Sequence, residues 1–95
     1  MQPEKYCDKP IIKIYSRLTG QRIRSKRIEL GYTQEQLAEK VDLDDKHLGR
    51  IERGEKTPLG PTLISIFHAL QIDANELYDL YEQALHELKD DCSSE

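Results

Sequence analysis

The sequence predicts an all-α protein with a small, compact core. Strong helix formers (Leu, Glu, Gln, Lys and Arg) dominate the chain, and Val41 is its only valine. No proline interrupts the stretch between Pro10 and Pro58. Leu, Ile, Val and Phe make up 24% of the 95 residues, above the roughly 20% below which charged chains usually stay disordered. A chain of this length fits one domain and is too short to enclose a large substrate cavity.

The first helix is expected over residues 20–30, and Gly31 is placed to end it. Residues 11–18, directly upstream, either extend this helix back towards Pro10 or form a short separate element, because their apolar positions fit both periods. One side of the helix is expected to carry Ile23, Arg27 and Leu30.

Residues 33–54 show the pattern of two short helices joined by a tight turn. Thr33 and Gln36 have the spacing of a capping box, so a helix is expected from here to about Val41. Asp44 is the candidate N-cap of the next helix, which Gly54 ends. This arrangement is the helix-turn-helix signature.

Two further helices are expected in the last third of the chain. Pro61 suits the first turn of one, and Asp73 and Glu76 mark the start of another that spans about residues 73–89. The ordered domain is therefore expected over residues 11–90. Residues 1–10 and 91–95 are expected to be loose terminal segments.

Charge is distributed unevenly along a chain whose net charge is −4. Residues 1–60 carry a balance of +3, and residues 61–95 carry −7. Residues 11–30 alone hold six Lys or Arg against one Glu. Such asymmetry indicates a basic face for a polyanion and an acidic remainder that faces elsewhere, although solvation of helix surfaces is an equally good account of the charge alone.

Other features argue against membrane, secreted, metal-binding and enzymatic classes. No apolar run approaches the length of a membrane span, and the first ten residues do not read as a secretory signal. Cys7 and Cys92 form no CxxC pair, which favours a reduced, cytoplasmic protein. We expect no metal and no cofactor, because no nucleophile or phosphate-loop motif is present and the histidines are widely spaced. These are His47, His68 and His86.

Three segments resemble the Cro/cI-type helix-turn-helix domains of phage repressors and related bacterial regulators (the XRE family). They are RIRSKRIELGYTQEQLAEKV, IERGEKTP and LISIFHAL followed by IDANELY, and together they span roughly residues 18–78. The resemblance implies a five-helix lambda-repressor-like DNA-binding domain whose third helix enters the major groove. The extra N-terminal residues and the long final helix also resemble the small dimeric controller proteins of restriction–modification systems.

The resemblance also implies roles for individual residues. A buried ion pair is expected between Arg27 and Glu52, because a guanidinium can bind a carboxylate through two hydrogen bonds. The base-reading residues are expected to be Gln34, Asp45, Lys46 and Arg50. Phosphate contacts are expected from Thr33, Arg24, Lys26, His47, Arg53 and Lys56.

Departures from the family pattern leave room for other functions. Three carboxylates cluster at the start of the third helix, at Asp42, Asp44 and Asp45, where they would repel DNA. Gln71 replaces a glycine after the fourth helix and is expected to need a left-handed backbone. The alternatives are an antitoxin or controller that also binds a partner protein, and a protein-interaction module that does not bind DNA.

The main expectation is a transcriptional regulator, a repressor or autoregulator, that binds double-stranded DNA as a homodimer on a palindromic operator. The last helix is the expected dimer interface, because it has more apolar surface than a small domain needs. Packing of this helix on its own core is the alternative. The interface residues are expected to be Leu80, Tyr81, Ala84, Leu85 and Leu88.

Overall fold

The computed structural model describes residues 10–93, which form five α-helices and no strand. This confirms the all-α, five-helix prediction. Of the segments expected to be loose, residues 1–9 and 94–95 lie outside the described residues, whereas Pro10 and residues 91–93 belong to helices, so the prediction is wrong for them. The helices are α1 (Pro10–Glu29), α2 (Gln34–Lys40), α3 (Asp45–Glu52), α4 (Gly60–Ala69) and α5 (Glu76–Ser93).

The first helix is longer than the expected 20–30 segment. Residues 11–18 continue α1 back to Pro10, so the first of the two alternatives for this stretch is correct. Pro10 starts the helix at a position where a missing N–H costs nothing. Gly20 is therefore not near a helix end but in the middle of α1, on the side that also buries Ser16 and Ile23.

The core lies where α1, α2, α3 and α4 meet. Each of these helices contributes one or two of the largest fully buried side chains, and Leu70, the C-cap of α4, adds another. Each helix therefore buries its apolar side only by packing against the others. The largest fully buried side chains are Phe67, Ile23, Leu37, Leu48, Ile51, Ile66 and Leu70.

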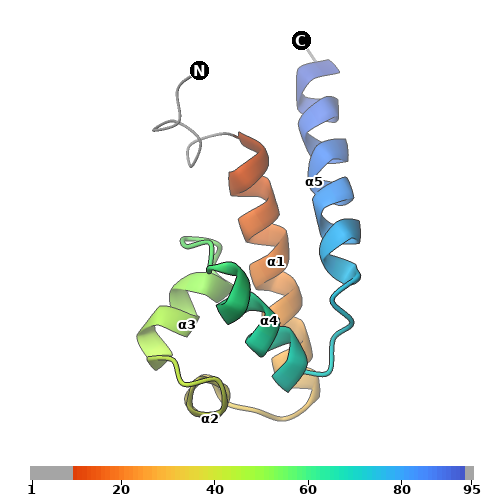
Figure 1. The fold of residues 1–95 in the computed structure, drawn as a ribbon. Coiled ribbons are helices and arrows are strands. Elements are labelled where there is room, and N and C mark those ends of the chain that lie inside the picture. The colour runs from red at the N-terminus through yellow and green to blue at the C-terminus, as the bar shows by residue number, and fades with distance from the viewer. Residues whose placement is uncertain (1–9, 94–95) are drawn as a thin grey trace.

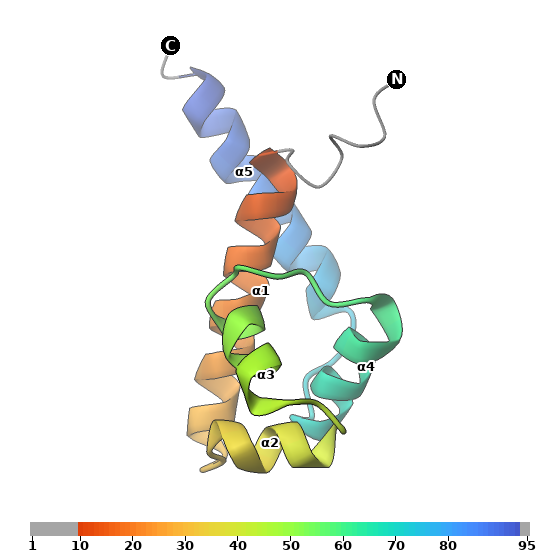
Figure 2. The same ribbon diagram turned by 90° about the vertical axis from the view of Figure 1, so that its left-hand side faces the viewer.

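The last helix, α5, runs alongside α1, and both project beyond the cluster of α2, α3 and α4 (Figures 1 and 2). Arg22 Nε donates to Glu76 Oε1 at 2.7 Å, and this hydrogen bond holds the pKa of the Glu76 carboxyl below its usual value. Higher up, the rings of Tyr15 and Tyr81 meet edge to face, with centroids 5.9 Å apart.

This packing corrects part of the expected dimer interface. Leu80 is 7% exposed and Ala84 is fully buried, because both belong to the stripe of α5 that packs within its own chain. They are core residues and are not available to a second copy. Tyr81 and Leu85 are about 40% exposed, and Leu88 is half-buried.

Helix α5 also begins three residues later than expected, at Glu76. Asp73 forms a local turn first, in which its Oδ1 accepts from the Asn75 N–H at 3.0 Å. The helix then continues past Lys89 to Ser93. No helix in the described stretch, 10–93, combines the length and apolar character needed to cross a membrane.

Two non-glycine residues hold a left-handed backbone at helix ends. Gln71 has φ 59°, as expected for the position after α4. Asp42 has the same φ directly after α2. The sequence places Asp42 among the carboxylates at the start of the third helix and does not predict this turn. Asp tolerates this conformation better than most side chains, since it can hydrogen-bond locally. Asp42 thus ends α2 instead of starting α3.

Candidate nucleic-acid interface

The α2–α3 unit is built from local capping interactions. Thr33 Oγ1 accepts from the Gln36 N–H at 3.0 Å, and the Gln36 side chain accepts from the Thr33 N–H at 2.9 Å. This is the capping box that the spacing indicates. Asp44 Oδ1 accepts from the Lys46 N–H, so that carboxylate is used as the N-cap of α3.

A buried ion pair ties α1 to the end of α3. Arg27 Nε lies 2.7 Å from Glu52 Oε2, and Arg27 Nη2 lies 3.1 Å from Glu52 Oε1. The two side chains are 10% and 1% exposed. Arg27 Nη1 also donates to the carbonyl of Tyr32 at 2.8 Å, which anchors the loop before α2. The pair that the family resemblance implies is therefore present, with every guanidinium nitrogen in a hydrogen bond.

Gln34 joins this network from the start of α2. Its Nε2 donates to Glu52 Oε1 at 3.0 Å. Because a carboxylate only accepts, the amide must turn its NH₂ group towards Glu52, and its Oε1 is left facing α3. Gln34 is half-buried, and its amide lies beside Gly49.

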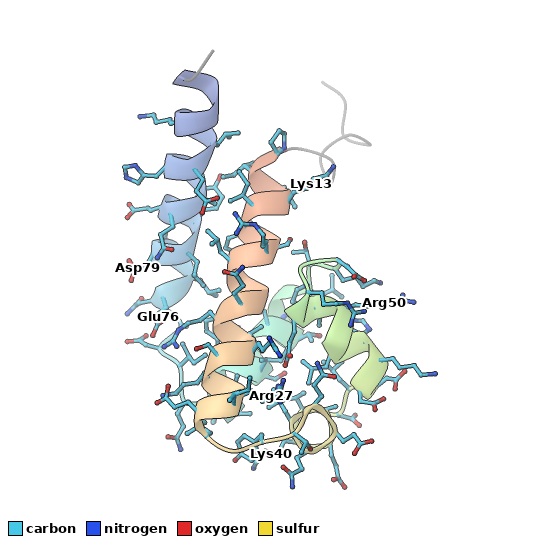
Figure 3. The ribbon with its side chains drawn as sticks, turned by 180° about the vertical axis from the view of Figure 1, so that it is seen from behind. Lys13, Arg27, Lys40, Arg50, Glu76 and Asp79 are labelled. Carbon is cyan, nitrogen blue, oxygen red and sulfur yellow. The ribbon has the colours of Figure 1, made fainter. Side chains whose placement is uncertain are left out.

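The outer side of α3 carries two exposed cations, of which Arg50 also helps to lower the pKa of the Glu55 carboxyl. Lys46 and Arg50 lie one turn apart and are exposed, and neither takes part in a salt bridge among residues 10–93. Figure 3 shows Arg50 on the side of α3 that points away from α5. Both line an open depression between α2 and α3, together with Gln34, Asp45, Gly49 and Arg53. Asp45 and His47 are half-buried.

The residues expected to contact phosphates differ in whether they are free to do so. Thr33, Arg24 and Lys56 are exposed. Arg53 binds Glu55 through Nε at 2.8 Å and Nη2 at 3.3 Å. That contact lowers the pKa of the Glu55 carboxyl. Arg53 thus brings its own counter-charge, and its remaining nitrogen, Nη1, faces Gly49.

Lys26 does not lie with the α3 face. It pairs with Glu29 at 3.4 Å and contributes to lowering the pKa of Glu76, which places it on the side of α1 that meets α5. Arg24 is two residues earlier and therefore about 200° away around the helix. Because the two side chains lie on nearly opposite sides of α1, they do not reach the same strand of the DNA backbone. Lys26 is therefore removed from the candidate interface.

Lys13 was not singled out from the sequence, although it belongs on the α3 side. It lines a groove with Arg53, Gly54 and Thr57, and it is exposed (Figure 3). The spacing in the sequence already indicates this position, because Lys13 precedes Gly20 and Arg27 by seven and fourteen residues and so shares their side of α1.

Comparisons with known proteins agree with the resemblance noted in the sequence. A helix-turn-helix family model matches residues 23–77. The HTH-type transcriptional regulator YazB of Bacillus subtilis is 40% identical over 58 residues, which cover 61% of this chain and 84% of YazB.

Two solved structures are similar in fold and sequence. One is the restriction-modification controller protein C.AhdI from Aeromonas hydrophila, with a TM-score of 0.61 and 34% identity over 65% of this chain and 94% of that chain. The other is the clp gene regulator ClgR from Corynebacterium glutamicum, with a TM-score of 0.68 and 27% identity over 84% of this chain and 87% of that chain.

Proposed function

Since the chain belongs to the helix-turn-helix family of transcriptional regulators, we propose that it binds a specific DNA sequence as a homodimer and acts as a repressor or autoregulator. A single helix-turn-helix unit reads few base pairs, so two units on a palindromic operator would supply the specificity. Binding to chromosomal DNA would place its work in the cytoplasm.

The observation that carries the proposal is the pair of exposed cations on α3, neither of which is in a salt bridge among residues 10–93. Lys46 and Arg50 face solvent on a helix that is fixed from behind by the Arg27–Glu52 pair. A rigid helix can present an arginine to guanine O6 and N7, which is the commonest specific contact to DNA. Asp45, next to them, would accept from a cytosine amine and disfavour bases without one.

Phosphate contacts on either side would fix the position of α3 in the groove. Arg24 and Lys56 are exposed, and Lys13 lines a groove with residues that follow α3. Such contacts set register and carry no sequence information. The proposed phosphate-binding residues are Lys13, Arg24, Thr33, His47 and Lys56.

Arg50→Ala is expected to remove about 1–3 kcal/mol of discrimination between the operator and random duplex. Lys56→Ala, the matched control, is expected to weaken binding to both duplexes alike, because a phosphate contact does not depend on sequence. The operator is first selected from a random pool with the wild-type protein, and affinities are then measured by fluorescence anisotropy. Equal losses on both duplexes for Arg50→Ala would remove its assignment as a base reader.

The proposed dimer surface is the second stripe of α5, which α1 covers only in part, where Tyr15 contacts the ring of Tyr81. Tyr78 is 77% exposed, and Tyr81 and Leu85 follow it at spacings of three and four on the same side. Leu88, half-buried, continues the stripe. Apolar side chains gathered on one side of a helix are typical of protein interfaces.

Sedimentation at micromolar concentration is expected to give a species of twice the 11.1 kDa chain mass. The double variant Tyr78→Glu, Leu85→Glu is expected to sediment as a monomer, because charges would be buried at the interface. Asp79→Asn, on the same helix but about 100° away from Tyr78, is the control and is expected to remain dimeric. A wild-type chain that stays monomeric would refute the homodimer.

A controller that also binds a protein partner is the second candidate, and the similarity to C.AhdI favours the controller role but does not bear on a partner. Both candidates require DNA binding, whereas a pure protein-interaction module does not. Salt separates these classes, since log affinity for DNA falls steeply with log salt when several phosphates are neutralised. A flat salt dependence would favour the interaction module.

A further inference from the structure

Gly49 is the one glycine inside α3, and no backbone requirement explains it. Its φ is not in the left-handed region, and glycine lowers helix propensity. A Cβ at this position would meet only the ends of two flexible side chains, Arg53 Nη1 at 3.3 Å and the Gln34 amide at 3.6 Å or more. Gly20, by contrast, faces backbone atoms. The reason for Gly49 therefore lies in what Arg53 and Gln34 do, not in the fold.

Both of these side chains are oriented by a carboxylate that leaves one polar atom unused. Glu55 takes Nε and Nη2 of Arg53, so that Nη1 remains as a donor. Glu52 takes Nε2 of Gln34, so that Oε1 remains as an acceptor. Both unused atoms lie over Gly49, at the edge of the depression that Lys46 and Arg50 also line. The absence of a side chain at 49 leaves a donor and an acceptor each within 4 Å of the position that a Cβ would occupy, beside the reading face.

Within a single base, a donor next to an acceptor matches only adenine in the major groove. In the major groove, adenine presents the N7 acceptor beside the N6 amine donor. A phosphate has only acceptor oxygens, and Gln34 Oε1 would repel it. Guanine presents two acceptors, N7 and O6, and matches only the donor.

We propose that Gly49 is a specificity-determining position at which Arg53 Nη1 and Gln34 Oε1 together bind the major-groove edge of one adenine in each half-site. This inference rests on the proposed function, and it changes the expected role of Arg53 from phosphate contact to base contact. Gly49 acts by positioning: a methyl group there would lie 3.3 Å from Arg53 Nη1 and would push that nitrogen aside by a few tenths of an ångström.

The test compares two glycine-to-alanine variants of the full chain on a duplex selected by the wild type and on a scrambled duplex. Gly49→Ala is expected to keep or raise the melting temperature, to lose about tenfold or more affinity for the selected duplex, and to bind the scrambled duplex unchanged. Gly60→Ala, where a Cβ meets open space at the start of α4, is expected to match the wild type on both. An undiminished affinity of Gly49→Ala for the selected duplex would overturn the proposal, and so would equal loss on both.

A second measurement uses the wild-type protein and needs no variant. Each adenine of the selected duplex is replaced in turn by 7-deazaadenine, which lacks the N7 acceptor, and by purine, which lacks the N6 amine. One adenine per half-site is expected to be sensitive to both replacements, with about a tenfold loss for each. Interference from methylphosphonates alone, with no sensitive adenine, would overturn the proposal in favour of a phosphate. A wild-type chain that selects no duplex would instead refute the proposed function itself.

Discussion

Arg27→Ala is expected to lower the free energy of unfolding by about 3–5 kcal/mol. The substitution leaves Glu52, whose side chain is 1% exposed, without its cationic partner. Only the Gln34 amide would still donate to that carboxylate. The Tyr32 carbonyl would lose its donor as well. The loss is a large share of the roughly 5–15 kcal/mol that stabilises a typical domain, so the variant is expected to be partly unfolded at physiological temperature.

Urea denaturation followed by circular dichroism measures this effect. Arg24→Ala is the matched control, because Arg24 lies on the same helix but is exposed, and it is expected to change stability by no more than about 0.5 kcal/mol. Replacing both members of the pair, Arg27→Met with Glu52→Leu, is expected to recover much of the loss, since no buried charge is then left unpaired. An Arg27→Ala chain as stable as wild type would mean that the pair contributes nothing to the fold.

Features set by neighbouring residues could be predicted from the sequence. The capping box at Thr33 and the N-cap at Asp44 involve partners two or three positions away, so the pattern alone fixes them. The ion pair of Arg27 with Glu52 spans 25 positions and was predicted only through the family resemblance.

Features that depend on the orientation of whole helices could not be predicted in the same way. Helix α5 carries two adjoining apolar stripes, and periodicity does not tell which of them packs within the chain, so Leu80 and Ala84 were assigned to the wrong one. A charge count includes Lys26 in the basic segment but does not show that it faces α5. The sequence does not show which side chains surround Gly49, because Gln34 comes from another helix and Arg53 from the end of α3.

Gly20 is the clearest such case, because its role depends on where α3 crosses α1. The C-terminal end of α3 lies very close to α1. A Cβ on Gly20 would lie 2.4 Å from the carbonyl oxygen of Ile51 and 2.6 Å from that of Glu52. These are backbone atoms of a helix that is itself held by the ion pair, so no side-chain rotation can relieve the contact. The crossing requires a residue without a side chain.

Gly20→Ala is therefore expected to destabilise the fold by about 3 kcal/mol, at the upper end of overpacking effects, although alanine favours a helix over glycine by about 1 kcal/mol. Thermal unfolding measures the change, and Gly60→Ala in the open first turn of α4 serves as the control with the same added methyl group. Because relief of the contact must move α3 away from α1, Gly20→Ala is also expected to weaken the ion pair between Arg27 of α1 and Glu52 of α3. A Gly20→Ala chain as stable as Gly60→Ala would show that the two helices can separate without cost, and that α3 is not held rigidly enough to read bases.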